Sequence, residues 1–132
     1  MKAVKITLAR RELYLLFNSE AMFQIQDQFG GTQEMLTALK LSATREGFAA
    51  LCKAVTILAE QGELTRRFLG YDTGRIFTAE ELERIIMPTD MVELSGAVMQ
   101  AITLGYGREI EPENNEIDLD LAELTQSQKK TT

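Results

Sequence analysis

The side chains that could take part in covalent or acid–base chemistry in this 132-residue sequence are a few carboxylates and a single thiol. Glu80, Glu81 and Glu83 are close enough in sequence to suggest paired acid–base carboxylates. They also fall in the first turns of a predicted helix, where acids are favoured by the helix dipole. Cys52 is a candidate nucleophile, but it lies on the apolar face of another predicted helix. We interpret the acids as a helix start and Cys52 as a small buried hydrophobe.

The remaining chemical motifs are weaker. Asp118 and Asp120 alternate as metal ligands can, but the twelve-residue calcium loop with its central Gly and final Glu is missing. The stretch GYGREIE lacks the third Gly of a phosphate-binding loop, and the basic spot at Arg66 and Arg67 is typical of a solvated helix face. The sequence has no histidine, the commonest general base and metal ligand. We therefore expect no enzyme activity, no cofactor and no metal site.

Composition narrows the class of protein further. The formal net charge is −6, whereas a protein that binds nucleic acid or an anionic membrane usually presents a basic surface. No run approaches the ~20 apolar residues that a membrane span needs, and we identify no signal peptide. A single cysteine excludes an internal disulfide and fits a cytosolic compartment. We expect a cytoplasmic protein with no nucleic-acid or membrane partner.

Alternating apolar residues at the start of the chain predict a β-hairpin. Val4, Ile6 and Leu8 alternate with polar residues, and a second alternating run follows the charged break ARRE. This second strand is also apolar on its other face, at Tyr14 and Leu16. A strand that is apolar on both faces is either covered on both faces by its own chain or offered to a partner, and its exposed edge leaves self-association open.

The rest of the first 107 residues predicts helices. A capped helix is expected over 18–29, a short one over 32–39, a central buried helix from Thr44, and further helices over 78–86 and 89–105. Gly62 is expected to weaken the central helix, so that GELTRRFLG forms a last turn or a second short helix. The GYDTG stretch, which includes Tyr71, predicts a loop joining two helices. The predicted fold is α+β, mainly α: a small N-terminal hairpin packed on a bundle of about five helices, in one domain over residues 1–107.

Residues 108–132 differ in composition from this domain. They are acidic and polar, and we expect a mobile C-terminal tail, because such a segment buries too little to offset its ordering entropy. Ile117, Leu119, Leu121 and Leu124 nevertheless stand between the acids. The segment EIDLDLAEL is therefore either a docking segment or a solvated tail.

Three stretches of the sequence, LYLLFNSEAMFQIQDQFGG, FAALCKAVTILAEQGELTRRFLGYD and VMQAITLGYGREIE, together with the acidic tail, resemble the small tail assembly chaperones of long-tailed phages and prophages. The resemblance covers Leu13 to about Glu111. It implies a non-enzymatic protein of the bacterial host cytoplasm that coats the long helical tape measure protein before the tail tube forms. It implies the tape measure protein as partner, with the tail tube protein as a second candidate. A longer frameshifted form is also implied, and Lys129–Lys130 is compatible with a slippery codon run.

Two other functions stay open at the level of sequence. The acidic tail could serve a protein-binding inhibitor or a DNA-mimicking regulator, and an uncharacterised enzyme subunit would need a deep pocket with converging charged groups. The residues that we expect to contact a partner are apolar or aromatic: Tyr14, Leu16, Tyr71, Ile117, Leu119, Leu121 and Leu124.

Overall fold

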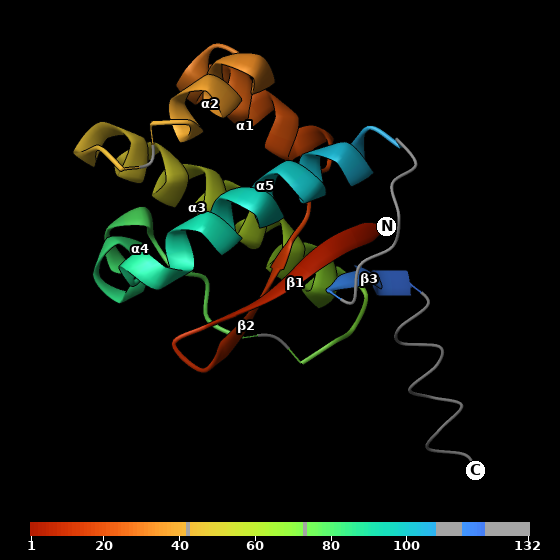
Figure 1. The fold of residues 1–132 in the computed structure, drawn as a ribbon. Coiled ribbons are helices and arrows are strands. Elements are labelled where there is room, and N and C mark those ends of the chain that lie inside the picture. The colour runs from red at the N-terminus through yellow and green to blue at the C-terminus, as the bar shows by residue number, and fades with distance from the viewer. Residues whose placement is uncertain (42, 73, 108–114, 121–132) are drawn as a thin grey trace.

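The computed structural model describes residues 1–41, 43–72, 74–107 and 115–120. Helices dominate it, as expected, and a small sheet packs against them (Figure 1). The elements follow one another as β1 (Lys2–Leu8), β2 (Arg11–Leu15), α1 (Ser19–Phe29), α2 (Thr32–Leu39), α3 (Arg45–Phe68), α4 (Ala79–Ile85), a 3₁₀ turn (Pro88–Asp90), α5 (Met91–Gly105) and β3 (Glu116–Asp118). The predicted class, α+β and mainly α with an N-terminal hairpin, is confirmed.

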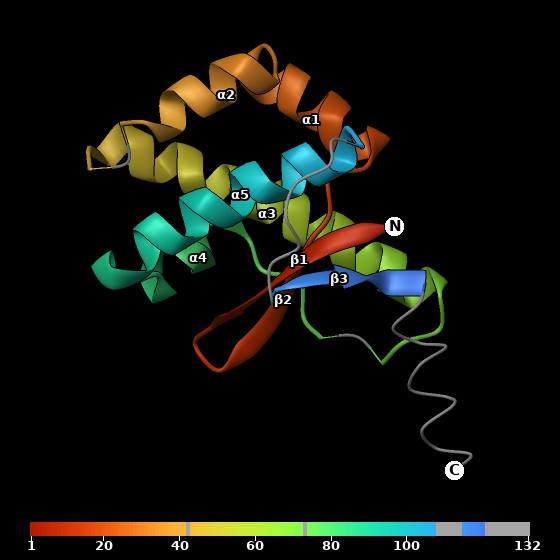
Figure 2. The same ribbon diagram turned by 45° about the vertical axis from the view of Figure 1, so that its right-hand side comes forward.

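The elements form layers that both ribbon views show. Helices α3 and α5 lie between the α1–α2 pair on one side and the sheet on the other (Figure 1, Figure 2). One face of the hairpin supplies buried aliphatic side chains to this interior, with Val4 opposite Leu15 and Ile6 opposite Leu13. This face and the inner sides of the helices make the main core.

The sheet has a third strand that the sequence analysis assigned to the tail. Strand β3 pairs antiparallel with β1, placing Ala3 opposite Ile117 and giving the order β2-β1-β3. The expected domain end at residue 107 therefore needs correction, since residues 115–120 belong to the folded unit. Ordering this segment costs conformational entropy, and backbone pairing with β1 and the burial of Leu119 offset that cost. The composition of the segment reveals neither of these two contributions.

Helix α3 is the central element, and it runs without a break through Gly62, which differs from the expected weakening there. A Cβ atom at Gly62 would lie only 1.8 Å from the carbonyl oxygen of Tyr14. The glycine therefore lets β2 approach the helix backbone. The Leu16 N–H donates to the Leu58 carbonyl at 3.1 Å across the same contact.

The joint between α4 and α5 follows local rules. The Thr78 hydroxyl accepts from the Glu81 N–H while the Glu81 carboxylate accepts from the Thr78 N–H, so the two residues form a capping box at the start of α4. Pro88 begins the 3₁₀ turn, and Asp90 accepts the Met87 N–H at 2.9 Å. After this turn, α5 runs back across α3 toward the sheet.

Candidate functional site

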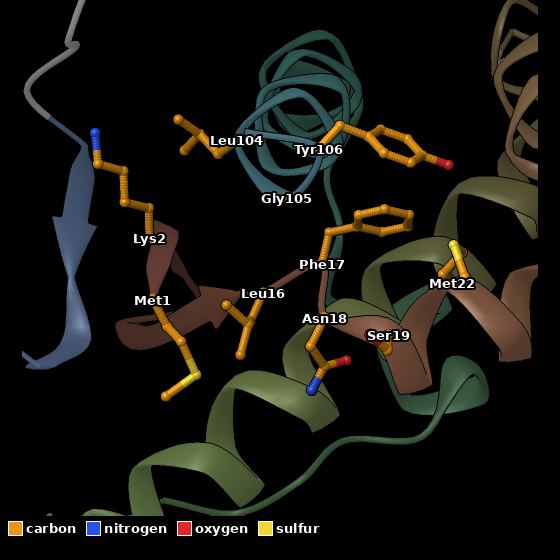
Figure 3. A pocket seen from close by; sticks show the side chains of 10 residues that line it. All are labelled: Met1, Lys2, Leu16, Phe17, Asn18, Ser19, Met22, Leu104, Gly105 and Tyr106. Carbon is orange, nitrogen blue, oxygen red and sulfur yellow. The ribbon is translucent and has the colours of Figure 1, made fainter. Parts of the chain in front are cut away.

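Two cavities open between the α1–α2 pair and α5. One, of about 350 Å³, is lined by the start of α1 and the end of α5, and by Met1, Lys2 and Leu16 (Figure 3). The other, of about 590 Å³, lies further along, between α2 and the middle of α5. Tyr106 lines both cavities. We call the two cavities together the α1–α5 groove, and their lining includes the apolar or aromatic Met22, Leu36, Met99, Ile102 and Tyr106 and the polar Gln26, Thr32, Gln33, Glu34 and Thr103.

Tyr106, which lines both cavities, is held in place by contacts with α2 and with the segment before α1. Its ring lies 5.1 Å from the Phe17 ring, centroid to centroid, with the two ring planes tilted by 54°, and the rings lie next to each other in Figure 3. Its hydroxyl shares a 3.3 Å hydrogen bond with the Thr32 hydroxyl at the start of α2. Gly105 permits this arrangement, because a Cβ there would lie 2.4 Å from the Phe17 carbonyl oxygen. The aromatic ring is therefore a fixed part of the groove, although 52% of the residue is exposed.

The outward face of α5 continues the groove toward the N-terminal end of the helix. Val92 and Met99 are 83% and 51% exposed, and their spacing of seven residues puts them on one side of the helix. Gly96 lies on the same side, between them. From Met87 to Gly107 the only charged residues are Asp90 and Glu93. A helix that is uncharged on nearly all sides is expected to be buried, yet this one has an open face.

Sequence reasoning did not select this face. The apolar side chains of α5 that face the interior are Leu94, Val98 and Ile102, which are buried, and Met91, which is half-buried. The signal was present, because MVELSGAVMQAITLGYG has one charge in its seventeen residues.

Five of the seven residues predicted to contact a partner lie together, but inside the protein. Tyr14, Leu16 and Leu119 are buried with Ala3 in a second apolar cluster, and Ile117 packs against it. The Tyr71 hydroxyl donates to the Leu119 carbonyl oxygen. The outer face of the hairpin is thus covered by its own chain, which was one of the two alternatives for this strand. Leu121 and Leu124 lie outside the described residues.

Arg66 organises this second cluster. Its guanidinium lies 4.2 Å from the Tyr14 ring centroid and 5.0 Å from that of Tyr71. It donates to the Glu63 carboxylate at 3.2 Å, and that carboxylate also accepts the Gly74 N–H at 3.1 Å. The interpretation of Arg66 as part of a solvated basic spot was wrong, because its side chain is only 13% exposed. The GYDTG joint is held to α3 by these contacts.

The candidate chemical groups have structural roles in the described chain. Cys52 is fully buried, and that burial raises the pKa of its thiol to about 12, with the negative charge of Glu83 adding to the effect. The pKa of Glu81 is lowered, first by its hydrogen bond to the Thr78 backbone and further by the nearby Arg75. Within the described ranges, no group of three or more Cys, Asp or Glu side chains could hold a metal ion.

The comparisons with known proteins add no family. No protein-family model, curated protein or solved structure matches the chain. Among the helices of the described residues, none is both long and apolar enough for a bilayer span.

Proposed function

We propose that this chain is a non-enzymatic assembly chaperone that binds an apolar helical client and keeps it soluble until the client is built into a larger structure. In keeping with the sequence resemblance, the proposed client is the tape measure protein of a long-tailed phage or prophage. The place of action is then the bacterial host cytoplasm.

The observation that carries the proposal is the open α1–α5 groove, together with the exposed apolar side chains of Val92 and Met99 on α5. Amphipathic helices commonly bind in grooves of this kind, with apolar residues at helical spacing as anchors. Met99, Met22 and Tyr106 line the groove. Methionine side chains adapt to differently shaped partners because they are unbranched and flexible. A surface of this kind suits a client whose apolar residues vary along its length.

The second apolar cluster does not offer a comparable surface. Leu119 is 1% exposed and Leu16 is 3% exposed, so a client could reach them only after β3 had left the sheet. We therefore propose the α1–α5 groove as the client-binding site, in place of the residues that the sequence suggested.

Co-expression tests the proposal. The chain is produced with the long helical protein encoded downstream of its gene, and the soluble fraction and the co-purified complex are measured. The client is expected to be insoluble alone and soluble in the complex. A globular protein of similar size, co-expressed in the same way, is the control. A client that stays insoluble and does not co-purify would contradict the proposal.

A further inference from the structure

We propose that the α1–α5 groove binds an amphipathic helix of about four turns whose apolar face is bordered by lysine or arginine residues. The inference rests on the proposed function for the natural client, and it adds the chemistry and length of the segment that the groove selects. Its grounds are the spacing of the open face of α5, an unexplained glycine on that face and the charges along the groove walls.

The length follows from the open face of α5. Val92, Gly96, Met99, Thr103 and Tyr106 succeed one another at alternating steps of four and three residues. This spacing keeps one side of a helix facing a partner helix. Val92 and Tyr106 are fourteen residues apart along the sequence, about 21 Å at the helical rise. A partner helix of about fourteen residues would cover this face.

Gly96 indicates a close approach by a partner. Glycine is among the least favourable residues inside a helix, and the comparable glycines of this chain have a reason within the fold. Gly62 and Gly105 leave room for the backbone of Tyr14 and Phe17. A Cβ at Gly96 would meet nothing within 4 Å. Gly96 therefore leaves room that the described chain does not use, and it lies on the side of α5 where Met99 is half exposed.

The charges of the groove walls determine the chemistry of the occupant. The charged residues that line the groove itself are Glu34 and Lys2. The helical segments on either side of it, residues 19–39 and 87–107, carry four further acids and no basic residue: Glu20, Asp27, Asp90 and Glu93. Lys2 lines one end of the groove, but its ammonium lies 3.1 Å from the Glu116 carboxylate. An apolar helix with basic borders complements these walls.

The same charges argue against a second copy of this chain as the occupant. Two copies that met through this face would bring two sets of acidic helices together, with Glu34 of each copy in its groove and no basic residue on the segments 19–39 and 87–107. Like charges placed together across an interface are unfavourable. Asp27 is also in the last turn of α1, where an acid opposes the helix dipole, so helix stability does not account for it.

Two synthetic peptides test the charge preference. Both are sixteen-residue amphipathic helices with the same leucine face, one with lysine borders and one with glutamate borders, and their binding to the full chain is followed by fluorescence anisotropy. We expect the lysine peptide to bind at least tenfold more tightly than the glutamate peptide, with an affinity that falls as salt rises. Equal binding of both peptides, or tighter binding of the glutamate peptide, would overturn the proposal.

Paired variants locate the binding to the groove. Gly96→Leu blocks the close approach of a partner helix to α5. It is expected to weaken binding of the lysine peptide at least fivefold, while the melting temperature of the protein is unchanged or raised. Met99→Ser is compared with Phe68→Ser, which removes an 86% exposed side chain at the end of α3. Glu34→Lys, at an acid that lines the groove, is compared with Glu83→Lys, which makes the same change of charge on α4. The first member of each pair should weaken binding and the second should not.

The outcomes separate this inference from the proposed function. If the client co-purifies equally well with wild type, Gly96→Leu and Met99→Ser, the groove is not the site and the inference fails, although the chaperone function stands. If the peptides discriminate as expected but the downstream protein is not held, the inference stands and the proposed function fails. A dimer in sedimentation that Gly96→Leu dissociates would make a second copy the occupant and overturn the proposal.

Discussion

The same substitution at two glycines is expected to change stability in opposite directions. Gly62 and Gly96 both lie inside long helices, α3 and α5. Replacing glycine by alanine in a helix stabilises it by about 1 kcal/mol when the new methyl group has room. At Gly96 nothing lies within 4 Å of the added Cβ, so Gly96→Ala is expected to gain about 1 kcal/mol.

At Gly62 the added Cβ would lie 1.8 Å from the Tyr14 carbonyl oxygen and 2.8 Å from the Tyr14 carbonyl carbon. Both neighbours are backbone atoms, so α3 and β2 must move apart. Overpacking of this kind costs about 1–3 kcal/mol. Weakening the adjacent Leu16–Leu58 backbone hydrogen bond costs about another 1–3 kcal/mol if its groups stay buried. After the helix gain is subtracted, we expect a net loss of about 3 kcal/mol.

Thermal unfolding followed by circular dichroism at 222 nm measures both effects. For a chain of this size the unfolding entropy is about 0.28 kcal/mol per degree. Gly96→Ala should therefore raise the melting temperature by about 3–4 °C and Gly62→Ala should lower it by about 10 °C. Denaturant unfolding with unchanged m-values would show that stability changed while the surface exposed on unfolding stayed the same. Two shifts of the same sign would refute the reasoning from Cβ contacts, including its use for Gly96 as a docking position.

Three other predictions concern the second apolar cluster and the buried thiol. Leu119→Ala should destabilise the fold by about 2 kcal/mol and speed amide exchange of the β1 residues that pair with β3, measured by hydrogen–deuterium exchange; unchanged exchange would contradict the role of Leu119. Arg66→Met should cost about 3 kcal/mol, because the buried Glu63 carboxylate loses its ion pair; chemical denaturation measures this, and Arg67→Met is the control at a more exposed neighbour. Cys52 should react with a disulfide reagent at pH 8 at least about a thousandfold more slowly in the folded protein than in the unfolded one, since a pKa of about 12 leaves little thiolate; equal rates would show that the thiol is accessible.

Local signals in the sequence identified most of the helices because their causes lie within a few residues. The Thr78–Glu81 capping box is an example, since both of its partners fall within four positions. The alternation of Val4, Ile6 and Leu8 likewise predicted a strand with one buried face. Fold class follows from such patterns, because each element carries its own periodicity.

Features that depend on distant partners were missed. Strand β3 pairs with a strand more than one hundred residues earlier, and its acids made it look like part of a solvated tail. The ion pair of Glu63 with Arg66 depends on burial, which the short charged stretch ELTRRF does not reveal. Tyr14, Leu16, Tyr71, Ile117 and Leu119 were predicted to contact a partner protein, and in the structure they contact one another within the same chain. Nothing in single-strand periodicity distinguishes the two cases.

The covering of the hairpin by β3 also explains why the groove is the better candidate for client binding. If one face of a strand with two apolar faces were open to solvent, it would be the surface of the molecule most prone to non-specific association. Here Leu119 and the Arg66-stacked tyrosines close it. One apolar surface that stays open in the described residues is the face of α5, where Val92, Met99 and Tyr106 are exposed and the backbone groups are hydrogen-bonded within the helix. Such a surface can bind and release a helix without exposing strand edges that would pair irreversibly, which is what a temporary holder of an apolar client requires.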